Sequence, residues 1–453
     1  MVYAHDLKSC AERLEGSSPS SPTNCRGGET GRRASLRSWW GNPWEFKSPP
    51  RHIVEKVIFS KKDYLWAAGL VLLAFLIRIP NISYPPEPAF DEVHYTNFAI
   101  RTLSGEVNID VHPPFARYLF SEFLKATSFN DLSRKIFLKE NYGDFPYIPL
   151  RFATVLAGSL LAGIVFLISR RFYDNLVLAL IPSWMVIFDG ALVSYSRYIL
   201  PDTYILFFGF LGILLLFHGL EFKNNITKLF LLSAAGLSMG FTASIKWSGL
   251  GFLASGLLYL IIYKKIKYGA ILIIFCLFGY ILPYTILLPE GAITSQPLLI
   301  KEMIRGHSKV IEFPGSDGEK ITASPILWLF ADRQFILWGN GKDDIVKLSP
   351  NLFGWTAVIV SIITSFFFAI RTRSRQTFFI LTSYFLNYLP FFLVSRSLYM
   401  YLYFPALIFG YLLIPETFKI VSDILSPGNI KKPAIIICCL TLLFFLIFIP
   451  FIY

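Results

Sequence analysis

Residues 434–452 read AIIICCLTLLFFLIFIPFI, and runs of this kind decide the fold. The run contains no charged side chain. It is long enough to cross the hydrocarbon core of a bilayer as a helix, which takes about twenty residues. A helix of that length on the surface of a soluble domain would carry a polar face. The run therefore predicts a membrane-spanning helix.

The composition of the whole chain agrees with this interpretation. Of 453 residues, 54% are apolar and only 16% are charged, and the mean hydropathy is +0.53. About a quarter of the residues in a soluble domain are charged. The net charge of +12 lies largely in short clusters between apolar runs, which does not favour nucleic acid as a partner. The chain is predicted to be an all-α integral membrane protein.

Similar apolar runs recur along the chain, and short basic clusters separate them. The clusters fall on one side of the membrane if the runs alternate in direction, and that side is the cytoplasm. The sequence thus predicts a multi-pass protein of the cell membrane with its N-terminus in the cytoplasm. We expect about eleven membrane helices, at roughly 64–82, 147–169, 174–190, 201–220, 229–245, 248–263, 269–288, 353–370, 377–394, 399–415 and 434–452.

Two long segments then lie outside the cytoplasm, at about 83–146 and 289–350. The first contains amphipathic stretches, Tyr95–Leu103 and Phe115–Ala126, which we expect to form short helices along the membrane interface. The second is polar, with aromatic residues at intervals. Loops of this length usually carry function.

Residues 1–52 differ from the membrane core at 53–453, because they are polar and rich in Ser, Gly and Arg. We expect either a disordered cytoplasmic tail or sequence that precedes the true start codon. The five cysteines show neither a disulfide framework nor metal-ligand spacing.

The first external segment opens with PPEPAFDEVHY, which places Asp91 and Glu92 just outside the first membrane helix, and continues with Asp110 and His112 in IDVHPPF. An arbitrary pair of carboxylates in a loop is usually just solvated. The surrounding sequence favours a site instead, because single basic residues occur at the outer ends of several predicted helices. These are Arg151, Arg197 with Asp202 after it, Lys246 and Arg396.

A lone basic residue at a helix end most often extends to the interface. Four on one side of the membrane, beside a carboxylate pair, suit a site for an anionic lipid phosphate. A carboxylate of that site would act on the incoming nucleophile.

PAFDEVHY followed by DVHPPFARYLF resembles the first external loop of the protein O-mannosyltransferases. Further similar segments follow in the family's order: YIPLRFATVLAGSL, FDGALVSYSRYILPDTYILFF, GLSMGFTASIKWSGLGF and, more weakly, SLYMYLYFPALIF. The resemblance runs from about 60 to 415. Two departures are Ala116–Arg117, where the family has Gly-Lys, and Pro201, where it has Leu. The soluble domain that eukaryotic members insert in the large external loop is absent, which fits a prokaryotic member.

The resemblance implies a glycosyltransferase of the GT-C type, with two functional external loops. Its donor would be a polyprenyl (dolichyl) phosphate mannose, and its acceptor a Ser or Thr hydroxyl of a protein outside the cytoplasm. The reaction would invert the configuration at the anomeric carbon. Asp91 would be the general base, with Glu92 supporting it. The residues expected to bind donor or acceptor are His112, Arg117, Arg151, Arg197, Asp202 and Lys246.

Other interpretations stay open. A related transferase could glycosylate a lipid or a cell-wall glycan instead. A transporter or scramblase would bury ionisable residues at the middle of its helices, whereas the charges here lie in loops and at helix ends. No Asp-x-Asp occurs and no metal is demanded, although Asp91, Glu92 and His112 carry groups that could hold a divalent cation. The oligomeric state is open.

Overall fold

The computed structural model describes residues 59–106, 110–286, 300–301, 303–305, 324–331, 335–340, 344–394, 398–425 and 431–453, without the side chains of 372 and 421–425. The N-terminal segment 1–52, much of the second external segment and Arg396 lie outside the described residues.

The described residues are mostly helical, and each of the eleven predicted spans coincides with a helix. These helices are α2 (Lys61–Arg78), α5 (Tyr147–Phe172), α6 (Leu176–Phe188), α8 (Asp202–Glu221), α9 (Asn225–Ile245), α10 (Leu250–Ile262), α11 (Gly269–Ile286), α14 (Leu352–Thr372), α15 (Arg375–Tyr388), α16 (Phe404–Leu425) and α17 (Lys431–Ile452).

Seven helices of the described residues are long and apolar enough to cross a membrane, and α6 is a shorter apolar helix, as is α10 with the 3₁₀ turn Trp247–Gly249 before it. The chain is thus a multi-pass membrane protein, while the count of eleven crossings stays a prediction. The orientation stays a prediction as well.

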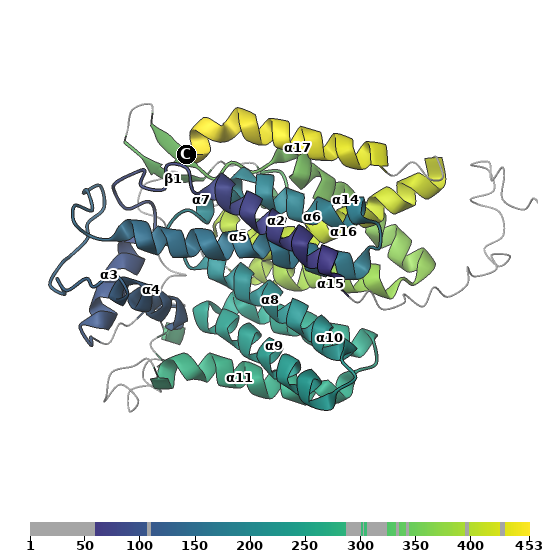
Figure 1. Cartoon of the computed structure of the whole chain (residues 1–453), viewed down its shortest axis with the longest axis horizontal. Coiled ribbons are helices and arrows are strands. Elements are labelled where there is room, and N and C mark those ends of the chain that lie inside the picture. Colours follow the sequence, from purple (N-terminus) through teal and green to yellow (C-terminus); the bar gives the residue numbers. More distant parts are fainter. Residues whose placement is uncertain are drawn as a thin grey trace, which may run out of the picture. The chain divides into compact units, whose positions relative to one another are not determined.

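The long helices run side by side, with the segments that connect their ends gathered at either end (Figure 1). Helices α5 and α16 are buried over most of their length, whereas α11, α14 and α17 are largely exposed. The exposed side chains on α14 include Phe366, Phe367 and Ile370. Such a wide apolar surface suits contact with lipid rather than water.

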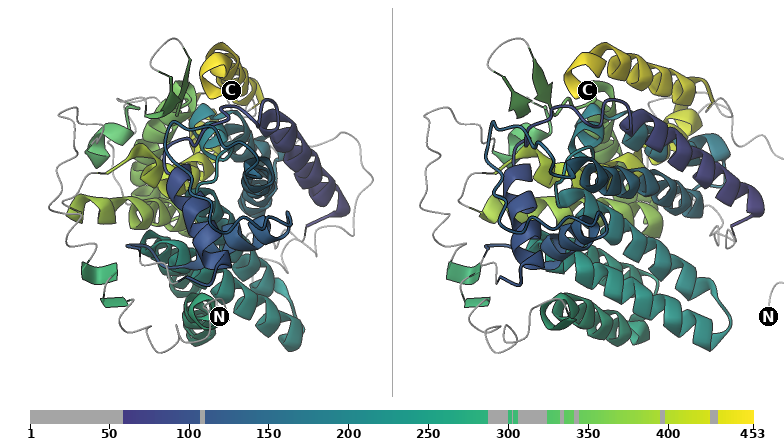
Figure 2. Two further views of the ribbon diagram at one scale, coloured as in Figure 1. Left: turned by 90° about the vertical axis from the view of Figure 1, so that its left-hand side faces the viewer. Right: turned by 60° about the vertical axis from the view of Figure 1, so that its left-hand side comes forward.

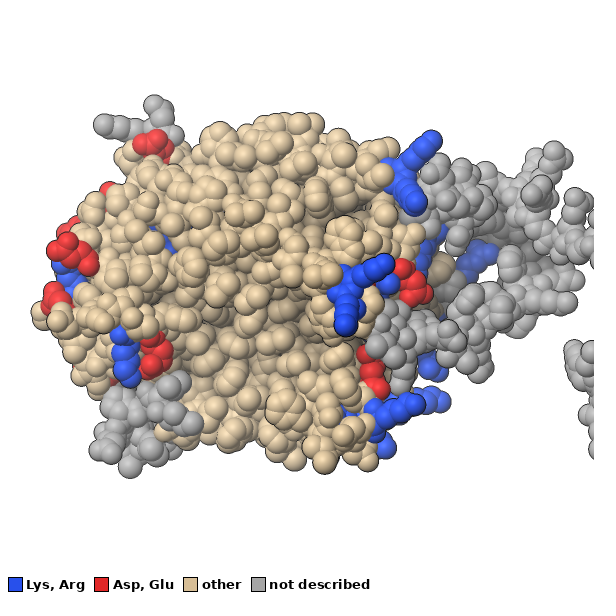
Figure 3. Space-filling view, viewed as in Figure 1, with Lys and Arg blue, Asp and Glu red and all other residues tan. Residues whose placement is uncertain are grey.

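Charged side chains on the visible face gather at the two ends of the helices, and a broad band between them carries none (Figure 3). This is the pattern that a bilayer imposes, because a charge in the hydrocarbon region is costly. Small residues let neighbouring helices approach closely between these ends. A Cβ added at Gly236 of α9, for example, would lie 2.7 Å from the Leu272 oxygen of α11.

The first external segment folds over one end of the helices (Figure 2). Both amphipathic stretches are helices, as the sequence predicts: α3 (Glu92–Leu103) and α4 (Phe115–Lys125). Tyr95, Ala99 and Ile100 of α3 are buried, and Phe120 of α4 packs against Tyr95 at 5.8 Å between ring centroids.

The prediction of an all-α chain is wrong in the second external segment. Besides the short helix α13 (Pro325–Trp328), it contains strands β1 (Ile336–Gly339) and β2 (Ile345–Lys347). They pair antiparallel with Trp338 opposite Val346, and a bulge interrupts the register. Each strand is short and rich in β-branched or aromatic residues, which favour a pleated surface.

Candidate active site

Asp91 lies on a tight turn at the start of α3. The Glu92 N–H donates to the Ala89 oxygen at 2.9 Å, which closes the turn, and the Asp91 oxygen accepts from the N–H groups of His94 and Tyr95 at 3.0 and 3.2 Å. The Asp91 side chain is partly exposed. Asp91 makes no capping hydrogen bond to α3, and unlike Glu92 it is not fully buried.

Glu92 has the opposite environment, although it is the next residue. It is fully buried, and Arg151 binds both carboxylate oxygens, with Nε at 2.9 Å from Oε1 and Nη2 at 2.7 Å from Oε2. The N–H groups of Ala89 and Ile199 also donate to this carboxylate, each at 2.8 Å. Glu92 therefore ties the Asp91 turn to α5 and to the segment before α8.

The N–H donors of Arg151 bind Glu92 and the backbone carbonyls of the first external loop. Its Nη1 donates to the oxygens of Ile82 and Pro85 at 3.1 and 2.9 Å, and Nη2 also donates to the Glu87 oxygen at 3.2 Å. With the two bonds to Glu92, these account for the five N–H donors of a guanidinium. In this conformation Arg151 supports the first external loop and has no donor left for a phosphate.

Arg197 is buried and binds the end of α2. Its Nη1 donates to the oxygens of Arg78 and Pro80, and its Nη2 to the Asn81 oxygen at 2.9 Å. The guanidinium carbon lies 4.3 Å from the ring centroid of Tyr453. The final carbonyls of a helix have no partner within it, so Arg197 satisfies groups that would otherwise be left unpaired.

Lys246 and Asp202 form an ion pair beside the turn. Nζ of Lys246 lies 2.7 Å from Oδ2 of Asp202, and the Tyr195 hydroxyl donates to the same oxygen at 2.7 Å. Asp202 is the first residue of α8, after Pro201. Nζ also lies 5.1 Å from the centroid of the Tyr401 ring. An ammonium has three N–H donors, and Asp202 uses one of them.

Electrostatic contacts connect Asp91 with this pair. Burial raises the pKa of the Asp91 carboxyl above its ordinary value of 3.8. The positive charge of Lys246 and, more weakly, His94 act against this increase, whereas the negative charges of Asp202 and Asp110 add to it. A base with a raised pKa holds a proton more strongly once it has accepted it.

His112 and Arg117 lie at the start of α4. Arg117 is buried, donates from Nη2 to the His112 oxygen at 3.2 Å, and lies over the ring of Phe98 at 5.6 Å. These contacts order the Pro113–Pro114 corner. Among the described residues, no group of three or more His, Cys, Asp and Glu side chains is arranged to hold a metal ion.

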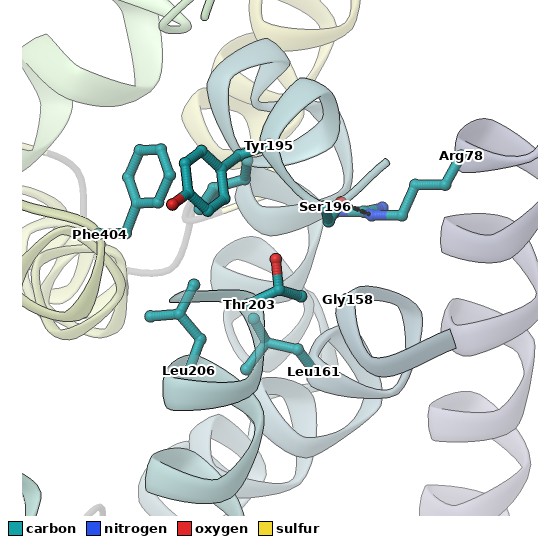
Figure 4. A pocket seen from close by; sticks show the side chains of 9 residues that line it. Arg78, Gly158, Leu161, Tyr195, Ser196, Thr203, Leu206 and Phe404 are labelled. Atoms are coloured by element: carbon teal, nitrogen blue, oxygen red, sulfur yellow. Dashed lines mark hydrogen bonds between the residues drawn. The ribbon is translucent and has the colours of Figure 1, made fainter. Parts of the chain in front are cut away.

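Two cavities of about 10 Å³, each with room for about one water, flank the Tyr195–Asp202 pair. The first, shown in Figure 4, lies between α2, α5, α8 and α16 and is lined by Tyr195, Thr203 and Phe404 among others. Nε of Arg78 donates to the Ser196 hydroxyl at its edge, at 2.9 Å. Asp202 and Tyr401 line the second cavity.

Several residues around the site were missed by the sequence interpretation. Arg78 is the last residue of α2, and its position as a basic residue at a helix end is the signal that identified Arg151 and Arg197. Tyr195 contacts Asp202, and Tyr401 contacts Lys246 and Phe90. Beyond their aromatic character, these residues have no signal in the sequence.

Comparison with known proteins gives a consistent family. Residues 69–292 match the family model described as dolichyl-phosphate-mannose-protein mannosyltransferase, and residues 298–453 match the model of the C-terminal four-transmembrane region of protein O-mannosyltransferase.

Two curated relatives are fungal. The dolichyl-phosphate-mannose–protein mannosyltransferase 1 of Candida albicans is 31% identical over 48% of the chain and 25% of its own length. The mannosyltransferase 4 of Schizosaccharomyces pombe is 34% identical over 34% of the chain and 20% of its own length. The matched segment thus spans about a quarter or less of these relatives.

The fold is shared with solved structures. A chain of the Saccharomyces cerevisiae protein O-mannosyltransferase Pmt1–Pmt2 complex bound to the sugar donor superposes with a TM-score of 0.72 at 16% identity, over 90% of this chain and 92% of the other. ArnT from Cupriavidus metallidurans, bound to undecaprenyl phosphate, gives 0.53 at 13% identity, over 84% and 71%. The fold is therefore of the GT-C type.

Proposed function

The chain belongs to the family of dolichyl-phosphate-mannose–protein mannosyltransferases, and from this premise we propose that it transfers mannose from a polyprenyl (dolichyl) phosphate to Ser or Thr hydroxyls of a protein. The reaction would take place on the extracytoplasmic side of the cell membrane, and the basic clusters between the apolar runs support this orientation of the first external loop. The absence of an inserted soluble domain from the sequence supports a member of the prokaryotic type.

The observation that carries the proposal is the different environment of the two neighbouring carboxylates. Glu92 is fully buried and bonded to Arg151, whereas Asp91 is partly exposed and makes no capping hydrogen bond to α3. The first can only support the loop, and the second is able to accept a proton. The pair resembles an acid–base site in which one group acts and the other holds it in place.

In the proposed reaction, the acceptor hydroxyl attacks the anomeric carbon of the mannose and gives its proton to Asp91. The bond between that carbon and the phosphate oxygen breaks, and the lipid phosphate leaves with an additional negative charge. The anomeric configuration inverts because attack and departure take place on opposite faces. Lys246, whose positive charge lowers the pKa of Asp91, would stabilise the departing phosphate.

This assignment changes two roles that the resemblance implied. Arg151 and Arg197 were expected at the phosphate, but their donors bind carbonyls and Glu92. We propose that both act as positioning residues. Arg117 and His112 remain candidates for the sugar or phosphate, and Asp202 would hold Lys246 in place.

The proposal is tested with purified protein in lipid and a radiolabelled polyprenyl-phosphate mannose. One reaction receives a Ser/Thr-rich peptide, the second the same peptide with Ala at every Ser and Thr, and the third a lipid and glycan extract. We expect label only in the first peptide. Label in the extract alone would show a transferase for lipid or glycan, and label in none would contradict transfer altogether.

A further inference from the structure

The turn that carries Asp91 has an unusual residue at its strained position. Phe90 has a φ of +49°, in the left-handed region, and Asp91 follows with φ −78° and ψ 0°. With the hydrogen bond from Glu92 N–H to the Ala89 oxygen, these values fit a turn of type II′. Glycine normally occupies the first central position of that turn, because a side chain there meets the backbone.

Both ends of this turn are held by Glu92. The Ala89 N–H donates to the Glu92 carboxylate at 2.8 Å, and the Ala89 oxygen accepts from the Glu92 N–H. The Glu92 carboxylate is in turn held by Arg151. The ends of the turn are thus fixed from the α5 side, and the Asp91 backbone oxygen is bonded to the first turn of α3, so the conformation of Phe90 depends on what holds its side chain.

The ring of Phe90 is held from the other side by three aromatic residues, which we call the aromatic clamp: Phe335, Tyr399 and Tyr401. The centroid of Phe90 lies 4.7 Å from that of Phe335 in an edge-on arrangement. It lies 5.8 Å from Tyr399 and 6.0 Å from Tyr401. Edge-on aromatic pairs are stabilising beyond the area they bury.

The clamp comes from parts of the chain far from the turn. Phe335 directly precedes β1 in the second external segment, and Tyr399 and Tyr401 lie just before α16. Tyr401 also contacts Lys246 and Tyr195. The ring of Tyr401 therefore contacts Phe90, next to the proposed base, and Phe335 of the second external segment. It also contacts the residues around the Lys246–Asp202 pair.

We propose that Phe90 is a positioning residue whose ring, held by the aromatic clamp, keeps the Asp91 turn in its strained left-handed conformation. The proposal rests on the role of Asp91 as the base of the proposed reaction. The strain is tolerated because the ring contacts favour this conformation. Without the contacts to the aromatic clamp, any residue other than glycine at position 90 would shift the turn and move the Asp91 carboxylate away from the acceptor hydroxyl.

Two substitutions at position 90 separate strain from packing. Phe90→Ala removes the ring but keeps a Cβ, so the left-handed conformation loses its support, and kcat should fall roughly tenfold or more. Phe90→Gly removes the same contacts but also the strain, and should recover most of that loss. The KM for the donor should change little in either variant. If packing alone mattered, Gly would be no better than Ala, because it also adds flexibility.

The control position is Leu132, an exposed residue of the same external segment that does not have a positive φ. Leu132→Gly should be no more active and no more stable than Leu132→Ala. A second pair tests the clamp. Phe335→Leu should lower kcat several-fold, and far less in the Phe90→Gly background, since coupled residues give non-additive effects. The exposed Phe330→Leu should be silent.

The experiment measures kcat, the KM for the donor and the thermal unfolding midpoint of each full-length variant in the same lipid. The proposal is overturned if Phe90→Gly is as slow as Phe90→Ala, or if Phe90→Ala turns over like the wild type. If the wild type transfers no mannose, the proposed function fails, and the midpoints decide this inference alone. Phe90→Gly should then unfold at a higher temperature than Phe90→Ala, and the reverse order would contradict it.

Discussion

Arg151 holds Glu92 by two parallel hydrogen bonds, from Nε to Oε1 at 2.9 Å and from Nη2 to Oε2 at 2.7 Å, with both side chains buried. The first external loop and the start of α5 are therefore joined by an ion pair directly behind the proposed base. A pair of this geometry combines charge with fixed orientation. Its two partners lie 59 residues apart in the sequence.

Breaking this pair should destabilise the fold rather than affect donor binding alone. Arg151→Ala leaves the Glu92 carboxylate buried without a counter-charge, which typically costs about 3–5 kcal/mol. Arg151→Lys retains the charge but loses the two-pronged geometry, so it should recover only part of the loss. The measurement is the thermal unfolding midpoint in lipid.

The matched control is the double variant Arg151→Met with Glu92→Gln, which removes both charges. It should be more stable than Arg151→Ala, because coupled substitutions are not additive. Wild-type stability in Arg151→Ala together with a loss of donor binding would instead place Arg151 at the phosphate.

The rate should depend on pH in a direction that follows from Asp91. Burial raises the pKa of this carboxyl above 3.8, and a general base works only when it is unprotonated. The rate should thus fall as the pH drops through the raised pKa, so the acid limb of the profile lies at a higher pH than for an ordinary Asp. The profile of kcat/KM for the donor measures this.

Lys246→Met tests whether the acid limb of the profile reports the pKa of Asp91. The positive charge of Lys246 lowers the pKa of Asp91, so its removal should move the acid limb to still higher pH and also weaken donor binding. Asp202→Asn removes a negative charge and should move the limb to lower pH. An acid limb that stays in place in both variants would exclude Asp91 as the titrating base.

The orientation that underlies the proposal is open to direct labelling. In a cysteine-free background, a cysteine at the exposed position Glu106 should react with a membrane-impermeant maleimide added outside the cell. A cysteine at Lys265 should react only after the membrane is opened. If position 106 were labelled only from the cytoplasmic side, the site would face the cytoplasm, and the proposed orientation would be wrong.

The helices could be predicted because a helix that crosses the bilayer needs a run of apolar residues of matching length, and such runs are visible in the sequence. The hairpin of β1 and β2 was not predicted, because it lies in a polar segment, and its Trp338 bonds to Glu87 of the distant first segment, at 3.2 Å between Nε1 and Oε2. The two amphipathic helices of the first loop were found because their buried faces follow the helical period.

The sequence singles out the candidate residues, whereas the contacts that each of them makes depend on the fold. Asp91 and Glu92 are adjacent and chemically alike, and only the partner Arg151, far along the chain, decides which one is buried. Arg151 and Arg197 stood out as basic residues at helix ends. Their use on the carbonyls of Pro85 and Pro80 depends on how the loop folds. The left-handed conformation of Phe90 has no signal in a single sequence.

The central claim is that Asp91 accepts the proton of the acceptor hydroxyl, and Asp91→Asn tests it most directly. Asparagine retains the shape of the side chain but cannot act as the base. The measurement is the initial rate of mannose transfer to a Ser/Thr peptide, with donor binding determined in the same lipid. The rate should fall by about 10²–10⁴-fold while donor affinity changes little. Turnover near the wild-type rate in a folded Asp91→Asn protein would contradict the account.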